Sequence, residues 1–398
     1  MRERHLIGFL TTVQFVHMVD FVIMMPLAPL LMRAFGIGTG EFALMLSAYT
    51  FAAAASGIAA GFLIDRFDRR RALLPLMLGL SLATMACAWA PTHHWMIAMR
   101  ALAGAFGGVL SSLVMAIIPD VVPPERRGRA IGVVMTSFAL ASIIGIPIGM
   151  TLATTFTWHT PFLALGCVAL CITLWGALAF PSMRHHVAAQ HASPAQTVRA
   201  IFGRSDHWWA FALTFTMAFA GFTVIPFISP SLVGNVGFRD DQLQYVYLTG
   251  GLASVMTSPW IGRLSDRFTP VRVFTVTALA SVFPLLAVTN LPPIGVPLAL
   301  AVTVVFIIFV SGRFVPATTL IANTVEPRLR GSFMSFNSAV MSAASGFAAL
   351  VAGALVTKAD DGRILHYPRV GWLAAACTLA SVALAWTIVK ARKQVPPP

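Results

Sequence analysis

The sequence predicts an all-α membrane protein, with twelve transmembrane helices arranged as two pseudo-symmetric six-helix bundles. Of its 398 residues, 58% are hydrophobic and only 10% are charged, and the mean hydropathy is +0.81. In an ordinary soluble domain about 25% of the residues are charged. Apolar runs recur along the chain at about the 20-residue length that a bilayer core requires. Two loop motifs that each occur twice and a one-sided distribution of basic residues support the same fold.

Twelve apolar segments account for almost the whole chain. We expect transmembrane helices at about residues 7–32, 42–63, 72–90, 95–118, 130–153, 160–181, 208–232, 243–262, 271–289, 295–320, 331–355 and 370–389. The first segment follows a basic start, but its apolar run is too long for a signal-peptide core. No small-residue cleavage site follows it, so we expect it to be retained as a span.

The formal net charge is +13, which in a soluble protein would suggest binding to nucleic acid. Here the positions of the charges indicate topology. Twenty basic residues fall in expected cytoplasmic segments, and five fall on the opposite side: Arg33, Arg239, Lys358, Arg363 and Arg369. This bias follows the positive-inside rule. We therefore expect an integral protein of a bacterial inner membrane, with both termini in the cytoplasm and no nucleic-acid partner.

Few side chains in the apolar segments could perform chemistry. Four cysteines lie within apolar helices: Cys87, Cys167, Cys171 and Cys377. No histidine or carboxylate accompanies them, which favours packed small hydrophobic residues over a metal or redox site. The sequence contains no Walker loop, no Rossmann glycine fingerprint and no cluster of metal ligands. We therefore expect no cofactor, no bound metal and no catalytic residues, and an enzyme is not predicted.

Two loop motifs occur twice at one spacing. The sequence G-F-L-I-D-R-F at 61–67 corresponds to G-R-L-S-D-R-F at 262–268, which lies 201 residues later. Glu125 and Glu326 lie in a second pair of similar loops and are again 201 residues apart. Two motif pairs at one offset predict two six-helix halves. The predicted organisation is an N-terminal bundle at 1–181, a polar cytoplasmic linker at 182–206 and a C-terminal bundle at 207–398.

This arrangement resembles the major facilitator superfamily over nearly the whole chain. Six residues match the loop motif G-x-L-a-D-R-x-G-R-[RK] of the family: Gly61, Leu63, Asp65, Arg66, Arg69 and Arg70. Asp68 replaces the second glycine of the motif. The second copy retains Asp266 and Arg267, whereas Thr269 and Pro270 replace the glycine and the arginine after it.

Helices 1, 4 and 5 resemble the drug-efflux branch of this family. Asp20 precedes a Leu-Ala-Pro sequence on helix 1, and Arg100 matches the arginine of helix 4. Three residues of helix 5 correspond to an antiporter motif: Gly145, Pro147 and Gly149. The proline of this sequence lies one residue later than in that motif, and two of the motif's glycines are replaced. The resemblance implies a transporter of the major facilitator fold, near drug:proton antiporters and arabinose-efflux-permease-like exporters.

The resemblance also implies a conformational switch. A carboxylate at a helix end favours a neighbouring helix N-terminus or arginine, and it loses that contact when the two halves rock apart. The residues expected to act in the switch are Gly61, Asp65, Arg66, Arg70, Gly262, Asp266, Arg267, Gly145, Pro147 and Gly149. The alternative is a static set of solvated charges that only anchors the topology.

Asp20 is the only carboxylate in the middle of an expected span, and a charge there usually faces a cavity or a partner. At 1.5 Å per residue, Asp20 lies roughly 20 Å from the inner start of helix 1. Arg100 lies about 8 Å below the outer start of helix 4, so the two depths nearly coincide. His17 and Gln14 lie one and two turns further inward on the face of Asp20.

Several roles are open for this group. Burial opposes the negative charge of Asp20 and a nearby Arg100 favours it. The carboxylate could therefore exchange protons during a transport cycle, which is the role that we prefer. The pair could instead be a permanently ionised link between helices 1 and 4, or the two side chains could face elsewhere. His17 could relay the proton or only orient Asp20.

The expected substrate-binding residues are Gln14, Arg313, Phe215, Phe219 and Phe222. Arg313 on helix 10 either faces the central cavity or snorkels to the cytoplasm. In the cavity it would give two cations against one anion, which disfavours a cationic substrate. The three phenylalanines form a stripe on helix 7 and could instead pack in the protein or face lipid.

These observations predict a proton-coupled secondary transporter that exports a small organic solute, such as a drug-like compound, a sugar or a metabolite, by alternating access. The alternative is proton-coupled uptake (symport) of a sugar or an organic anion, because the antiporter motif of helix 5 is incomplete. The expected partners are a small-molecule substrate, protons and the lipid bilayer, and we expect a monomer.

Overall fold

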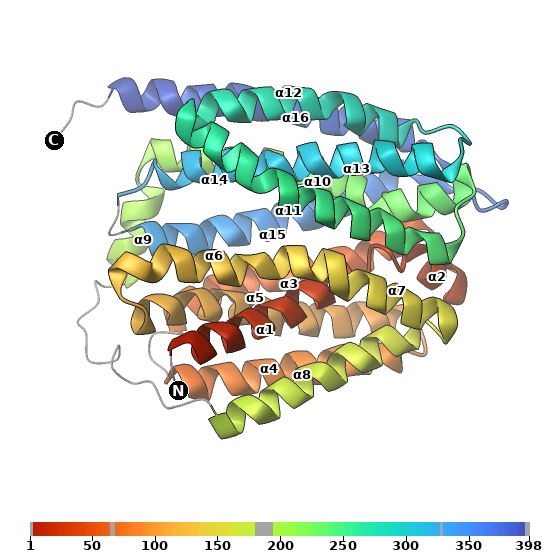
Figure 1. Cartoon of the computed structure of the whole chain (residues 1–398), viewed down its shortest axis with the longest axis horizontal. Coiled ribbons are helices and arrows are strands. Elements are labelled where there is room, and N and C mark those ends of the chain that lie inside the picture. The colour runs from red at the N-terminus through yellow and green to blue at the C-terminus, as the bar shows by residue number, and fades with distance from the viewer. Residues whose placement is uncertain (1–2, 64–67, 180–193, 327–328, 395–398) are drawn as a thin grey trace. The chain divides into compact units, whose positions relative to one another are not determined.

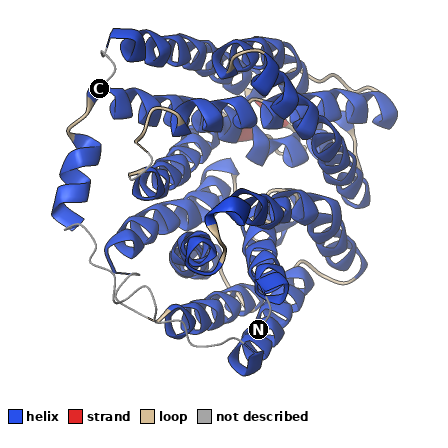
Figure 2. Cartoon of the chain, turned by 60° about the vertical axis from the view of Figure 1, so that its left-hand side comes forward, coloured by secondary structure: helices blue, strands red, loops and turns tan. Residues whose placement is uncertain are grey.

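The computed structural model describes residues 3–63, 68–179, 194–326 and 329–394. Apart from one short two-stranded hairpin, these residues form helices and the loops between them (Figure 2). The contacts of the chain divide it into two compact units. The first contains residues 1–37 and 44–191, and the second contains residues 38–43 and 192–398. The sequence-based boundaries, with a linker at 182–206, stay a prediction.

The first unit contains the N-terminal helices (Figure 1). Its elements are α1 (Glu3–Val22), α2 (Ala28–Ala34), most of α3 (Thr39–Leu63), α4 (Arg69–Ala88), α5 (His93–Val121), α6 (Pro124–Leu140), the π-helical turn η2 (Ala141–Gly145), α7 (Ile146–Thr155) and α8 (His159–Ala179). Helix α4 packs between α5 and α8, and α1 packs against α5, α6 and α8. Apolar side chains of these helices, such as Phe9, Met77 and Leu110, form one buried core.

The second unit contains the remaining elements (Figure 1). They are α9 (Pro194–Phe202), α10 (Ser205–Ser231), η4 (Leu232–Val236), η5 (Asp240–Gln242), α11 (Leu243–Arg267), α12 (Pro270–Thr289), α13 (Val296–Gly312), α14 (Phe314–Ala322), α15 (Arg330–Leu355), β1 (Thr357–Lys358), β2 (Ile364–Leu365) and α16 (Tyr367–Gln394). Helix α10 packs against α15 and α16, and α12 lies beside α16. The strands pair antiparallel, and Asn235 holds Ile364 of β2 through two hydrogen bonds.

Length and hydropathy identify membrane-spanning helices. In the part of the chain that the structure describes, 11 helices are long and apolar enough to cross a bilayer. This agrees with the predicted class of helical membrane protein. The segment expected as the eighth span, 243–262, lies within α11, whose polar and small residues lower its hydropathy below that of the other eleven. The number of twelve spans therefore stays a prediction.

The structure corrects three expected elements. The single helices expected at 7–32 and 295–320 are each divided in two, as α1 with α2 and as α13 with α14. Pro26 lies in the first break and Pro316 follows the second, and proline has no N–H to donate to the carbonyl of the preceding turn. The expected linker also contains a helix, α9, whose Ile201 is buried in the core of the second unit.

Two glycines of α5 allow α3 to approach closely. A Cβ atom on Gly104 would lie 2.8 Å from the Cα atom of Tyr49, and one on Gly108 would lie 2.7 Å from the Cα atom of Ala53. A spacing of four residues puts both glycines on one face of α5 and both partners on one face of α3. Small residues at this spacing let helix backbones pack together within a membrane.

We predict that Gly104→Ala lowers the apparent melting temperature of the purified protein in detergent, because the added methyl group overlaps the backbone of Tyr49. Overpacking of this kind costs about 1–3 kcal/mol. Gly132→Ala in α6 is the matched control, since a Cβ atom there would meet nothing within 4 Å. The control should melt at the wild-type temperature or above it, because alanine favours a helix more than glycine does. Equal melting temperatures for the two variants would contradict the close approach.

Candidate functional site

A buried ion pair lies inside the first unit. Arg100 Nη1 on α5 donates to Asp20 Oδ1 on α1 at 3.0 Å, and Arg100 Nη2 donates to the backbone oxygen of Asp20 at 3.0 Å. Thr84 Oγ1 on α4 donates to the same carboxylate oxygen at 2.8 Å. The side chains of Asp20 and Arg100 are 0% and 1% exposed. One carboxylate thus joins three helices.

The break in helix 1 explains why the backbone of Asp20 takes part. Pro26 cannot donate to the carbonyl of Val22, which accepts from Met25 N at 3.1 Å instead. Helix α1 therefore ends two residues beyond Asp20. The carbonyls of a last helical turn lack helical partners and need other donors. The Arg100 guanidinium supplies such a donor for Asp20 while it also binds the carboxylate.

Tyr49 on α3 completes the surroundings of Arg100. The Arg100 guanidinium carbon lies 4.3 Å from the centre of the Tyr49 ring, which is the geometry of a cation–π contact. Both side chains are buried. Neither Tyr49 nor Thr84 was predicted from the sequence. The one feature that could have indicated Tyr49 is that it is the only tyrosine before residue 245.

His17 and Gln14 lie on α1 and are both buried, as is Asp20. Gln14 Nε2 donates to Ser111 Oγ on α5 at 3.3 Å. The Gln14 Oε1 and His17 Nδ1 atoms are buried and have no hydrogen-bond partner among the described residues. The same is true of Asp20 Oδ2. Each of these three residues of α1 therefore has one buried polar atom without a hydrogen-bond partner.

The helix 5 residues lie against the part of α1 that carries Asp20. A Cβ atom on Gly145 would collide with the Val19 side chain, and one on Gly149 would lie 2.5 Å from the Cδ1 atom of Ile23. Pro147 follows the π-helical turn η2, in which Ile146 N donates to the carbonyl five residues earlier. The glycines thus fit α1, and their part in a conformational switch stays a prediction.

The first loop motif is described only in part. Asp65 and Arg66 lie outside the described residues, and Gly61 lies near the end of α3. Arg70 Nη2 donates to the backbone oxygen of Ala177 on α8. Arg70 therefore links α4 and α8 inside the first unit.

Two other residues of this motif, Asp68 and Arg69, have structural roles that were not predicted from the sequence. Asp68 accepts hydrogen bonds from the backbone N–H groups of Arg70 and Arg71 at 2.9 and 3.3 Å and so caps α4. A capping carboxylate explains why Asp68 suits a position where the family motif has glycine. Arg69 Nε forms an ion pair with Asp120 Oδ2 at the end of α5, at 2.8 Å. The cap could have been predicted, because aspartate is common just before the first residue of a helix. Nothing in the sequence predicts that Arg69 pairs with Asp120.

The second loop motif lies at the end of α11. Gly262 is part of the helix, and Asp266 and Arg267 are exposed on its last turn. The Arg267 guanidinium carbon lies 5.6 Å from the centre of the Phe268 ring. The exposed charges fit either a switch or a topology anchor, and the switch stays a prediction.

Arg313 lies at the break between α13 and α14 and is 0% exposed. Its Nη1 donates to Thr378 Oγ1 on α16 at 2.9 Å, and its Nη2 donates to the backbone oxygen of Met217 on α10 at 3.2 Å. Its guanidinium therefore remains inside the second unit and does not reach the protein surface in this structure. Snorkelling, one of the two orientations left open by the sequence, is not observed.

The phenylalanine stripe lies on α10. Phe215 is 36% exposed, and its ring stacks on Phe219 with centroids 5.9 Å apart. Phe347 of α15 lies 6.5 Å from Phe215, and Phe222 is half-buried. The stripe is thus an aromatic surface that is partly accessible, and its contact with substrate stays a prediction.

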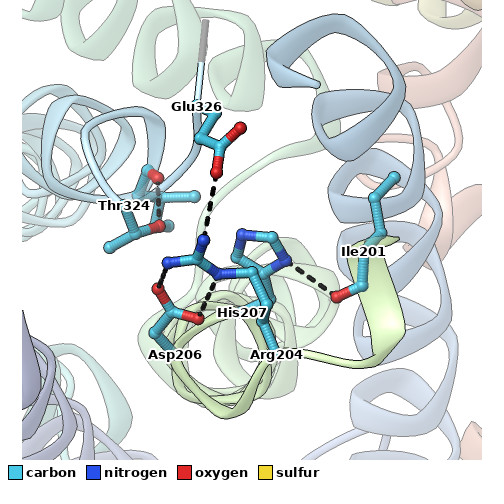
Figure 3. A network of polar contacts seen from close by, with 7 residues as sticks. Ile201, Arg204, Asp206, His207, Thr324 and Glu326 are labelled. Atoms are coloured by element: carbon cyan, nitrogen blue, oxygen red, sulfur yellow. Dashed lines mark hydrogen bonds and ion pairs between the residues drawn. The ribbon is translucent and has the colours of Figure 1, made fainter. Parts of the chain in front are cut away.

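A polar network joins the start of α10 to two other elements (Figure 3). Arg204 donates to both carboxylate oxygens of Asp206, at 3.1 and 2.8 Å, and to Glu326 at 3.2 Å. The hydrogen bond with Asp206 raises the pKa of Arg204 above its usual value. His207 Nδ1 donates to the backbone oxygen of Ile201 on α9 at 2.7 Å. The network fixes α9, α10 and the loop before α15 to one another, and the sequence analysis did not predict it.

Comparison with known proteins supports a transporter. A family model described as "Major Facilitator Superfamily" matches residues 10–223 and 210–398. The chain is 26% identical over 384 residues to an uncharacterized MFS-type transporter, YceJ, of Bacillus subtilis, and the match covers 96% of each chain. It is 22% identical to a multi-drug resistance efflux pump PmrA homolog of Lactococcus lactis, across 94% of this chain and 92% of the relative.

Two solved structures share the fold. One is a bacterial homolog of the human lysosomal transporter Spinster, in an inward-facing and occupied conformation, with a TM-score of 0.77 at 16% identity and coverage of 99% of each chain. The other is a mutant of the nucleoside transporter NupG, with a TM-score of 0.76 at 11% identity and coverage of 97% of this chain and 100% of that one. With family matches across nearly the whole sequence, the chain belongs to the major facilitator superfamily of membrane transporters.

Proposed function

We propose that this chain is a secondary active transporter that exports a small organic solute in exchange for protons, by alternating access, from a bacterial inner membrane. The observation that carries the proposal is the fully buried Asp20–Arg100 pair. Membership of a transporter family supports transport, and the efflux pump relative, at 22% identity, favours export over uptake. The positive-inside bias supports cytoplasmic termini.

Protonation of Asp20 would change the charge of the buried cluster. The ionised pair is neutral as a whole, and its mutual attraction offsets part of the cost of removing two charges from water. A proton on the carboxylate leaves the cluster positive, because arginine cannot lose its own proton. A site whose net charge changes in a low-dielectric interior responds strongly to proton binding. This is the property that proton coupling needs.

The geometry allows this change without displacing Arg100. When Asp20 is protonated, the attraction between Arg100 Nη1 and Asp20 Oδ1 loses its ionic part. The hydrogen bond from Arg100 Nη2 to the backbone oxygen of Asp20 and the contact with the Tyr49 ring do not depend on that charge. The guanidinium therefore stays anchored while its charge becomes available to other groups.

Arg313 supports a substrate that is anionic, zwitterionic or neutral. Its guanidinium donates to the Thr378 hydroxyl and to the backbone oxygen of Met217, which are both uncharged. The described acids of the second unit all lie at helix ends or in loops: Glu41, Asp206, Asp240, Asp241, Asp266, Glu326, Asp360 and Asp361. An uncompensated buried cation would repel a cationic solute and attract an anionic group. Gln14 and the stripe of Phe215, Phe219 and Phe222 are the further proposed substrate contacts. Because Arg313 is fully buried, contact with substrate requires movement at the α13–α14 break.

We predict that Asp20→Asn abolishes substrate-driven proton movement in vesicles. Purified protein is reconstituted with the dye pyranine in the lumen, and compounds that stabilise it in a thermal-shift screen are added outside. Exchange makes the lumen more alkaline as substrate enters, whereas symport makes it more acidic. The exposed Asp241→Asn is the matched control and should behave as wild type.

The double variant Asp20→Asn/Arg100→Gln separates coupling from structure. Asp20→Asn alone leaves a buried arginine without its counter-ion and costs about 3–5 kcal/mol. The double variant removes that unpaired charge, so its melting temperature should recover while proton movement stays absent. Recovery of proton movement together with stability would contradict the coupling role and support a purely structural pair.

We also predict that Arg313→Gln weakens binding of organic anions by roughly tenfold or more, since a charge-assisted hydrogen bond contributes about 1.5–3 kcal/mol. Binding is measured as the thermal shift that each compound causes, with uncharged analogues as the comparison. The melting temperature without ligand should stay level or rise, because the variant removes an unpaired buried charge. Arg239→Gln, at an exposed arginine, is the control. Equal losses for charged and uncharged ligands would contradict an anion-binding role.

A further inference from the structure

Unsatisfied polar atoms gather in one place in the first unit. Among the described residues, several buried side-chain nitrogen and oxygen atoms have no well-formed hydrogen bond. Five of them belong to one cluster, in which the Tyr49 hydroxyl lies beside the Asp20 carboxylate: Gln14 Oε1, His17 Nδ1, Asp20 Oδ2, Tyr49 Oη and Arg100 Nε. A buried polar atom without a partner costs about 1–3 kcal/mol, so five in one cluster indicate a ligand that supplies the missing hydrogen bonds.

The chemistry of the five atoms indicates which ligand fits. The carboxylate and amide oxygens accept hydrogen bonds, the Arg100 nitrogen donates one, and the phenol of Tyr49 and the imidazole of His17 can do either. An anion would be repelled by Asp20, and a metal cation would be repelled by Arg100. Water both donates and accepts, and it binds in buried sites that offer two to four polar partners.

Gly107 on α5 leaves the room that this cluster needs. A Cβ atom on Gly107 would lie 2.8 Å from both the Tyr49 hydroxyl and His17 Cδ2, and 2.9 Å from His17 Nε2. The histidine ring and the tyrosine hydroxyl therefore both pack against the bare backbone of this residue. Any larger side chain at position 107 would overlap both of them.

The groups that face Asp20 come from four helices. Helix α1 contributes His17, α3 contributes Tyr49 and α5 contributes Arg100. Helix α4 contributes Thr84, which donates to Asp20, and Cys87, which lies beside the Arg100 guanidinium. The segment from η2 to α7 presents glycines to α1, so it adds no charge. Arg100 is thus the one described cation of this cluster, and His17 contributes its one imidazole.

We propose that Gln14, His17, Asp20, Tyr49 and Arg100 enclose a water-binding chamber inside the first unit, and that its water carries protons between His17 and Asp20. In the transfer, a water molecule gives a proton to Asp20 Oδ2 and takes one from Nδ1 of the His17 imidazolium. Water is unchanged, the imidazolium becomes imidazole and the carboxylate becomes a carboxylic acid. This inference rests on the proposed proton coupling, and it adds Tyr49 and Gly107 to the coupling site.

A structure determined at a resolution that shows ordered water provides the first test. We expect density for water within hydrogen-bond distance of Asp20 Oδ2 and of the Tyr49 hydroxyl. A cluster without water, in which the five atoms bond directly to one another, would overturn the chamber. This result does not depend on whether Asp20 takes part in transport.

Infrared difference spectroscopy of the protein in lipid tests the proton path and needs no substrate. The carboxylic acid band of Asp20 is identified by its loss in Asp20→Asn, and its exchange is followed after a change from H₂O to D₂O. In Gly107→Ala and Tyr49→Phe, exchange should be slower by about tenfold or more, because the water is displaced or loses a partner. Gly132→Ala is the control for the glycine and should exchange as wild type.

The two variants also separate this inference from the proposed function. Tyr49→Phe removes one hydroxyl and keeps the ring beneath Arg100, so it serves if Gly107→Ala does not fold. Wild-type exchange rates in both folded variants, with substrate-driven proton movement intact, would overturn the chamber and leave the proposed function standing. If only Asp20→Asn loses substrate-driven proton movement, and Gly107→Ala and Tyr49→Phe exchange at the wild-type rate, the chamber is again overturned. The proposed function then still stands.

Discussion

The first unit depends on one buried charge being compensated. Arg100 binds Asp20 through both its carboxylate and its backbone oxygen, Thr84 binds the same carboxylate, and the Tyr49 ring lies against the guanidinium. These contacts join α1, α3, α4 and α5 around a single point. A buried ion pair contributes little net stability by itself, but removing one partner is strongly destabilising. The pair therefore constrains four helices, and any change in its charge state alters contacts of all four.

The buried cation of the second unit, Arg313, has no ion-pair partner among the described residues of that unit. Arg313 has hydrogen bonds to a hydroxyl and a backbone oxygen, and no described carboxylate of that unit lies near the middle of its helices. The two units thus differ in charge where they are most buried: one contains a neutral pair and the other a positive group. If protons act on the pair and an anionic group of the substrate acts on Arg313, the two ligands of an exchanger bind at chemically distinct places.

Much of this structure could be predicted from the sequence, for a physical reason. Apolar runs of bilayer length leave a helix as the only conformation that satisfies the backbone, so the helices were predictable. The Asp20–Arg100 pair was predictable because charges in such runs are rare and their depth follows from residue number. Thr84 and Tyr49 were not, since neutral polar side chains are tolerated in many helical positions. The helix breaks were not predictable either. Pro26 and Pro316 lie in or just after breaks, yet other prolines lie within continuous helices: Pro75, Pro226, Pro230, Pro259 and Pro284.

The backbone around the ion pair is irregular on two neighbouring segments. Helix α1 ends two residues after Asp20, and the π-helical turn η2 lies against it, with Gly145 touching Val19. Broken helices and π-helical turns are common at functional sites of transporters. Here Arg100 is anchored to the backbone oxygen of Asp20, on the regular side of the break. In the proposed coupling, the segment beyond the break can shift when the carboxylate gains a proton, while the guanidinium and the inner part of α1 stay in place. The proposed charge change and the irregular backbone coincide, which suits the conversion of proton binding into helix movement.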